Sequence, residues 1–235
     1  MIARVVAGGV ALLLLAGATA APKRDNVVEA YGQIRAQIKG FDYTLVQRGG
    51  KWSAREPSEP KLDRAAEVDI ANGFIRIDDE GTGGGNFETQ VALWRVEDDA
   101  FVGIVETHKD GGIPGQSRVR FFKKIDRNWI DKTPDVWTPV GLPAFMKGDM
   151  TIEDLRALQT IGAAVYVALP REGTEITAEL KLSSTEEYAC KGDASVNLAE
   201  KKPAWDRYCQ KLKPGLATAV ALRFDTERTK FYLKD

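Results

Sequence analysis

The chain has 235 residues, of which 43% are hydrophobic and 29% are charged, with 33 Lys and Arg against 34 Asp and Glu. This composition is typical of a folded globular protein and excludes collagen-like, wholly disordered and polytopic membrane proteins. The formal net charge of -1 leaves no basic excess to neutralise a phosphate backbone. We therefore expect no nucleic acid partner.

Residues 1–20 have the pattern of a secretory signal peptide. Arg4 gives a short positive region, residues 5–16 form an apolar run of 12, and the small residues at 18–20 suit signal peptidase. Cleavage after Ala20 is favoured, because cleavage one residue later would leave Pro22 directly after the scissile bond. A retained membrane anchor is the alternative, although spanning the hydrocarbon takes about 20 apolar residues. We expect a periplasmic or secreted protein with no transmembrane segment after signal cleavage.

The mature chain begins with a predicted helix and continues with antiparallel β-structure. Residues 26–38 place Val27, Tyr31 and Ile34 at helical spacing. After Gly40 the apolar residues alternate, and short strands rich in aromatic residues flank polar turns. This pattern predicts β-hairpins over residues 43–54, 66–80, 92–104, 120–132 and 221–233.

Residues 133–150 are rich in proline and glycine and mark the best candidate for a domain boundary. Beyond them the sequence predicts a helix over 152–161, strands at 163–170 and 174–184, and a helix within 194–212 that Pro203 breaks or begins. The predicted fold class is α+β, mostly antiparallel β. We expect residues 21–147 to form the N-terminal helix and β-meander and residues 148–235 an α+β part. One continuous domain is the alternative.

The chain contains two cysteines, Cys190 and Cys209, which are 19 positions apart. In an exported chain such a pair favours one disulfide, and the alternative is two free thiols. Neither residue belongs to a C-x-x-C motif, so a redox role has little support.

His108 is the sole histidine of the sequence. A catalytic role would require orienting groups, which Glu106 and Asp110 could provide, but no nucleophile motif accompanies them. With one histidine and two cysteines that we expect to pair, the usual ligands of a zinc site are missing. We predict no metal site and no cofactor.

The segment 78–86 (DDEGTGGGN) is unusually rich in glycine and acidic residues. It lacks the lysine of a phosphate-binding P-loop, and Asn86 occupies the position of the last glycine in a G-x-G-x-x-G motif. A calcium loop that uses Asp78, Asp79, Glu80 and Asn86 is an alternative, but these residues depart from the EF-hand pattern. We interpret the segment as a loop that joins two strands.

Among the five tryptophans, Trp137 stands out because prolines flank it in the sequence TPDVWTPV. Tryptophans on hairpin strands ordinarily pack against neighbouring strands, whereas a tryptophan in an irregular proline-rich segment is a better candidate for a surface site. We therefore predict Trp137 as a ligand-binding residue.

Residues 73–140 resemble uncharacterised secreted bacterial proteins. The shared order of features is GFIRIDDEGTGGGN, then a strand with Trp94, then a charged hairpin and RNWIDKTPDVWTP. The resemblance implies an exported, β-rich module and assigns no functional residues.

These observations favour an exported, non-enzymatic protein that binds a protein, a peptide or a cell-envelope component. The alternative is a hydrolase of envelope glycan or peptide that uses two carboxylates drawn from Asp78, Asp79, Glu80, Glu88 and Glu106. Two inward carboxylates in a cleft would favour the hydrolase, whereas an exposed strand edge or aromatic patch would favour binding.

Overall fold

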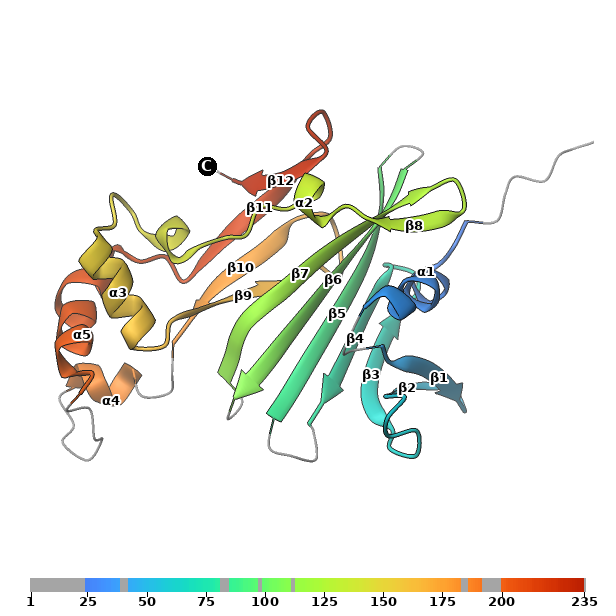
Figure 1. The fold of residues 1–235 in the computed structure, drawn as a ribbon, viewed down its shortest axis with the longest axis horizontal. Helices are drawn as coiled ribbons and strands as arrows, with labels where there is room; N and C mark the ends of the chain where they lie inside the picture. The colour runs from blue at the N-terminus through green and yellow to red at the C-terminus, as the bar shows by residue number, and fades with distance from the viewer. Residues whose placement is uncertain are drawn as a thin grey trace, which may run out of the picture.

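The protein folds into two antiparallel sheets, and the N-terminal helix lies against one face of the larger sheet (Figure 1). The predicted signal peptide at 1–20, residues 81–84 of the glycine-rich segment and part of the helix expected within 194–212 lie outside the described residues. The computed structural model describes residues 24–38, 42–80, 85–96, 99–110, 113–182, 186–191 and 200–234.

Helix α1 (Val27–Ile34) opens the described chain. Asn26 and Glu29 form a capping box, in which each side chain accepts a hydrogen bond from the backbone N–H of the other residue. The helix predicted over 26–38 continues beyond Ile34 as a 3-10 turn, η1 (Arg35–Gln37). The buried face of α1 includes Val27 and Tyr31 and packs against the larger sheet.

The larger sheet is an eight-stranded meander in which every strand pairs with its neighbours in the sequence. The predicted hairpins at 43–54, 66–80 and 120–132 are confirmed, as is the pairing across 92–104. At the first hairpin Gly49 and Gly50 have φ of 56° and 80°, a conformation that favours glycine. The strands are β1 (Thr44–Arg48), β2 (Lys51–Arg55), β3 (Arg64–Asp69), β4 (Phe74–Asp79), β5 (Gly85–Val96), β6 (Asp99–Asp110), β7 (Ile113–Ile125) and β8 (Asn128–Asp131).

The smaller sheet has four antiparallel strands in the order β12-β11-β10-β9. Together with the helices it confirms the α+β class, mostly antiparallel β. Its strands are β9 (Ala164–Ala168), β10 (Ile176–Lys181), β11 (Ala219–Asp225) and β12 (Lys230–Leu233). The remaining helical elements are α2 (Thr133–Val136), η2 (Leu142–Phe145), α3 (Ile152–Thr160), α4 (Glu186–Lys191), α5 (Lys202–Arg207), η3 (Tyr208–Leu212) and η4 (Lys213–Gly215).

Each face of the larger sheet buries its own hydrophobic cluster, because successive side chains of a strand point to opposite faces. One face packs against α1 through residues such as Ile75 and Val91. The other face packs against the smaller sheet, where Trp94 and Phe121 meet Phe231. This second cluster draws on residues from both sides of position 147. The division into 21–147 and 148–235 stays a prediction.

The disulfide between Cys190 and Cys209 is confirmed, with a Cα–Cα distance of 5.5 Å. It joins α4 to η3, the π-helical turn that follows α5. Pro203 lies in the first turn of α5, as expected from its missing N–H donor. Within the described residues, no helix has both the length and the apolar character needed to cross a bilayer.

Candidate functional site

Trp137 follows α2, in the proline-rich connection between the two sheets. Its side chain is 7% exposed. The ring centroids lie 5.7 Å from Phe121 of β7 and 6.3 Å from Phe231 of β12. Trp137 therefore anchors the connection to the aromatic core, and its remaining surface contributes to a groove.

We call this hollow the Trp137 groove. It has a volume of about 290 Å³, at the lower end of the range for small-molecule pockets. One wall comes from β7, the opposite wall from β9, and the proline-rich connection closes the third side. The groove is lined by Ser117, Val119, Thr133, Pro134, Trp137, Pro139, Val140, Val165 and Val167.

The β7 wall is a strand edge that β8 covers only in part. β8 pairs with β7 from Phe122 to Ile125. At Phe121 the edge is held by the connection, because the Phe121 amide donates to Thr133 Oγ1 at 2.9 Å and the Lys132 amide donates to the Phe121 carbonyl at 2.8 Å. Val119 lies two residues earlier on the strand, so its backbone N–H points toward the same side as that of Phe121, away from β6. Within the described chain this amide has no hydrogen-bond partner.

The β9 wall is also an open edge, since β9 pairs with β10 and with no other described strand. β9 lies beside β7 (Figure 1). The Val167 amide donates to Ser117 Oγ at 2.9 Å, and the Leu169 amide donates to Gln90 Oε1 at 2.8 Å. The amide of Val165, next along this edge, has no partner among the described residues. Val119 and Val165 thus leave two backbone edges unpaired beside Trp137.

A buried polar cluster holds β9 against the larger sheet. Glu88 is 2% exposed and accepts a hydrogen bond from Tyr166 Oη at 2.6 Å and another from Gln90 Nε2. Lys109 and Arg76 form ion pairs with the same carboxylate. Burial opposes ionisation, but the hydrogen bonds from Lys109, Tyr166 and Gln90 hold the pKa of Glu88 below its ordinary value. The cluster therefore fixes the position of one wall of the groove.

Of the five carboxylates considered for hydrolysis, Asp78 and Glu88 lie together, and both form ion pairs with Arg76 and Lys109. Glu80 is exposed. Asp78 pairs in register with Glu88 on the face toward the smaller sheet. Asp79 lies on the opposite face, where it accepts hydrogen bonds from Tyr43 Oη at 2.9 Å and Arg64 Nε at 3.0 Å.

Glu106 is on the α1 side of the sheet and is 5% exposed. Neither of its carboxylate oxygens has a hydrogen-bond partner among the described residues. An Arg118 nitrogen lies 3.5 Å away as an ion pair. Burial raises the pKa of Glu106, with the positive charges of Arg120 and Arg118 opposing the rise.

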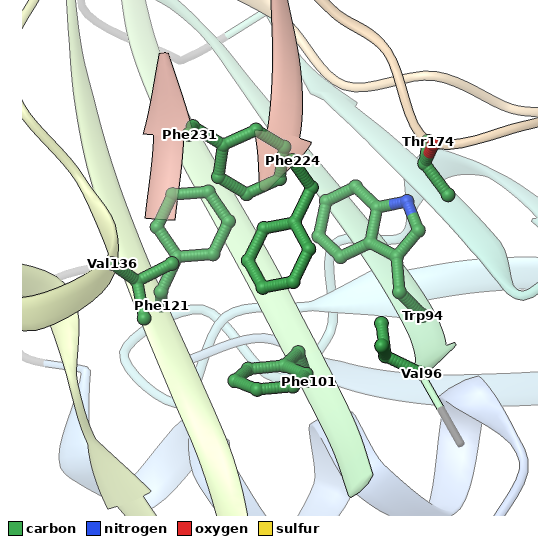
Figure 2. Close-up of a pocket in the computed structure, with 8 residues that line it drawn as sticks. All are labelled: Trp94, Val96, Phe101, Phe121, Val136, Thr174, Phe224 and Phe231. Carbon is green, nitrogen blue, oxygen red and sulfur yellow. The ribbon is translucent and has the colours of Figure 1, made fainter. Parts of the chain in front are cut away.

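A second hollow, between the two sheets, is part of the aromatic core (Figure 2). Its volume is about 20 Å³, enough for roughly one water molecule. The Trp94 indole N–H donates to the Gly173 carbonyl at 3.2 Å. The small volume of this hollow indicates a packing gap and not a ligand site. The hollow is lined by Trp94, Val96, Phe101, Phe121, Val136, Thr174, Phe224 and Phe231.

His108 is exposed on β6, and its ring lies 4.8 Å from that of Phe87. Within the described chain its ring has no hydrogen-bond partner. No group of three or more His, Cys, Asp and Glu side chains suited to a metal ion occurs among those residues.

The sequence singled out Trp137 but missed the two open edges that flank it. The sequence does contain a signal for the β7 edge. The strand that follows the turn at 126–127 must end before Pro134, because proline disrupts strand pairing, and so this strand is short. The first half of the longer strand 113–125 then has no paired strand on that side within the described part of the chain. The open edge of β9 depends on long-range pairing, which no local pattern reports.

No family model and no curated protein matches the chain. Among solved structures it is similar to one described as a domain of an uncharacterized protein from Porphyromonas gingivalis W83. The two share 14% sequence identity with a TM-score of 0.46, over 82% of this chain and 79% of that chain. The structural similarity is thus weak and concerns an uncharacterised bacterial protein domain.

Proposed function

We propose that the protein is a non-enzymatic binding protein that holds an extended peptide segment of a partner protein in the Trp137 groove. The observation that carries this proposal is the pair of open strand edges on either side of the groove, where the amides of Val119 and Val165 have no hydrogen-bond partner among the described residues. A buried or half-buried amide without a partner costs free energy, which a bound strand recovers by accepting its hydrogen bond.

The mode of binding is strand addition. An extended peptide supplies carbonyl and N–H groups to an open edge, and pockets select its alternate side chains. Here the rings and methyl groups of Trp137, Val119 and Val165 supply an apolar pocket beside the edges. The favoured ligand is therefore an extended segment with a β-branched or other apolar side chain at the position that meets Trp137.

We also propose that the protein acts in the periplasm or is secreted. The Cys190–Cys209 disulfide supports this location, since such bonds persist in oxidising compartments. The sequence pattern of residues 1–20 supports it independently.

A displayed library of random decapeptides, selected against the whole mature protein, tests the proposal. Enriched peptides should carry alternating apolar residues and bind by titration calorimetry. Trp137→Ala should weaken their binding at least tenfold, and Val165→Pro should do the same because proline removes the edge amide without touching the β9–β10 ladder. Trp52→Ala, in the distant β1–β2 hairpin, is the matched control. Failure to enrich any peptide, or equal binding by all four proteins, would overturn the proposal.

The carboxylate-dependent hydrolase has less support. Asp78 and Glu88 share one face of the sheet, but Arg76 and Lys109 form ion pairs with both carboxylates. Asp79 and Glu106 lie on the opposite face. Mass spectrometry of the selected peptides after prolonged incubation with the protein distinguishes the two functions. Intact peptides agree with binding alone, whereas cleavage that Glu88→Gln abolishes would favour the hydrolase.

A further inference from the structure

The turn between β3 and β4 carries the sole Asn-Gly pair of the sequence. It spans residues 70–73, which join Asp69 of β3 to Phe74 of β4. Asn72 is exposed in this turn, whereas Gly73 is buried. An asparagine side chain is able to react with the backbone nitrogen of the residue that follows it. The surroundings of these two residues therefore decide whether the turn is a chemical site.

The backbone around position 73 requires glycine. Gly73 has a φ of 69°, a conformation that side-chain-bearing residues rarely adopt. Its carbonyl accepts the Leu93 amide of β5 at 2.8 Å. A Cβ atom at this position would lie 2.9 Å from the Leu93 carbonyl oxygen. The fold thus places after Asn72 the one residue type that has no side chain to obstruct its own nitrogen.

Neither of the two atoms that would react is held by a hydrogen bond at that atom. The Gly73 amide donates no hydrogen bond within the described part of the chain. Asn72 is held only through its nitrogens there, because its backbone N–H donates to Asp69 Oδ1 at 3.1 Å and its Nδ2 donates to Asp69 Oδ2 at 2.9 Å. The Gly73 nitrogen is therefore available as a nucleophile, and the Asn72 Cγ atom belongs to an exposed side chain.

We propose that Asn72 is a site of spontaneous deamidation through a cyclic imide with Gly73. The Gly73 nitrogen forms a bond to Asn72 Cγ while the Cγ–Nδ2 bond breaks, and the Gly73 amide proton leaves with the Nδ2 group as ammonia. Water then adds to one of the two imide carbonyl carbons. Opening at the side-chain carbonyl gives aspartate. Opening at the main-chain carbonyl gives isoaspartate, whose backbone runs through Cγ.

Both products disturb a contact between the turn and the β9–β10 connection. Asp69 Oδ2, which accepts Asn72 Nδ2, also accepts Arg171 Nε at 2.8 Å. The hydrogen bonds from Asn72 and Arg171 lower the pKa of Asp69 to about 2. Deamidation replaces the Asn72 donor by a second carboxylate, and a neighbouring like charge opposes ionisation of Asp69. Isoaspartate also lengthens the backbone next to the Gly73 carbonyl that Leu93 holds.

Incubation of the whole mature protein in mildly alkaline buffer, followed by trypsin digestion and mass spectrometry, tests the proposal. Asn72 and Asn128 fall in separate fragments, 65–76 and 128–132. Asn128 is the internal control, because it is exposed beside a hairpin turn but precedes Trp129.

Fragment 65–76 should exchange its amide for a carboxyl about tenfold faster than fragment 128–132, since glycine leaves its nitrogen unobstructed. The product should contain isoaspartate and one oxygen from isotope-labelled water. Asn72→Gln, which would need a larger ring, should keep its amide. Equal rates in the two fragments, or a product without isoaspartate, would refute the proposal.

Asn72→Asp reproduces the aspartate product and tests its effect on the turn. NMR titration should show the pKa of Asp69 rising from about 2 toward 3.8 in this variant. Asn72→Ala removes the same side-chain donor without adding a charge, so it should raise this pKa by less. An Asp69 pKa that is unchanged in Asn72→Asp would contradict the expected loss of the contact. Circular dichroism confirms that each variant is folded.

Discussion

Glu106 and Thr89 are directly opposite each other in the β5–β6 pair, and within the described residues neither side chain has a hydrogen-bond partner. Both are buried, at 5% and 1% exposure. A buried carboxyl group without hydrogen bonds has a lower free energy when it is protonated than when it is ionised. The ionised form of Glu106 is therefore unfavourable on the sheet face that α1 covers.

The stability of the protein should consequently fall with rising pH through Glu106. Burial raises the pKa of this carboxyl above the 4.5 of an unfolded chain. The folded state therefore binds more protons than the unfolded state once the pH exceeds 4.5, and unfolding becomes easier up to the folded pKa. Glu106→Gln should stabilise the protein by about 1 to 2 kcal/mol at pH 7.

Urea unfolding of the parent protein and of Glu106→Gln at several pH values between 4 and 8 measures this effect. The advantage of the variant should grow with pH. Glu227→Gln, on an exposed turn, should show no such trend. A Glu106→Gln protein that is less stable than its parent at pH 7 would show that the ionised carboxylate is favoured.

Asp154 should have the opposite pH dependence. It closes the capping box of α3 with Thr151 and forms ion pairs with Arg207 and Lys211. Burial opposes ionisation, but these partners hold the pKa of Asp154 well below its usual value. Its stabilising effect is therefore present above pH 3.8 and is lost as the pH falls below it.

Asp154→Asn keeps an oxygen for the cap but removes the charge. The variant should be less stable than the parent protein by about 1 to 2 kcal/mol at pH 7. This difference in stability should become smaller below pH 3.8. Thermal melting at pH 7 and pH 3 checks this expectation. A difference that is equal at both pH values would mean that the ion pairs with Arg207 and Lys211 contribute nothing.

Gly103 should tolerate no side chain. A Cβ atom there would lie 2.6 Å from Trp94 Cζ3 and 3.0 Å from Phe121 Cε1, within the aromatic core of Figure 2. Overpacking of this kind costs about 1 to 3 kcal/mol, so Gly103→Ala should lower the free energy of unfolding by that amount.

Gly32→Ala is the matched control, because a Cβ atom at position 32 meets nothing within 4 Å. This residue lies inside α1, where alanine is favoured over glycine by about 0.5 to 1 kcal/mol. Chemical denaturation should therefore show the two variants changing stability in opposite directions. A neutral Gly103→Ala would indicate that the Trp94 ring moves aside freely.

Replacing Cys190 and Cys209 by serine should lower the free energy of unfolding by about 3 kcal/mol, since the unfolded chain regains the freedom of the closed loop. Trp205 and Leu212 still pack into the core, so α5 should loosen without detaching. Hydrogen exchange should accelerate more at 200–212 than in β6. Two free thiols in the unfolded, unreduced parent protein would contradict the bond itself.

Much of the fold was predictable because it is local. The hairpins of the larger sheet join strands that adjoin in the sequence, and polar turns such as Gly49-Gly50 and Asn72-Gly73 identify them. Period-two alternation also places Asp78 and Asp79 on opposite faces of β4.

The candidate site was predictable only in part. The proline-rich surroundings of Trp137 predicted a surface position, whereas its side chain is 7% exposed because it packs against Phe231, a residue far away in the sequence. Its role in ligand binding stays a prediction. The pairing of β10 with β11 likewise crosses a long connection that contains α4 and α5. No local pattern specifies which strand edge such pairing leaves open, so the edge at Val165 emerges from the structure alone.

Amide hydrogen exchange at Val119 and Val165, measured by NMR in the free protein and in the protein saturated with a selected peptide, tests the central claim most directly. Strand addition in the Trp137 groove predicts that exchange at one or both of these amides slows at least tenfold on binding, because they donate to the carbonyl groups of the peptide. Amides in the β1–β2 hairpin should be unaffected. Saturating peptide that leaves exchange at both valines unchanged would contradict the claim.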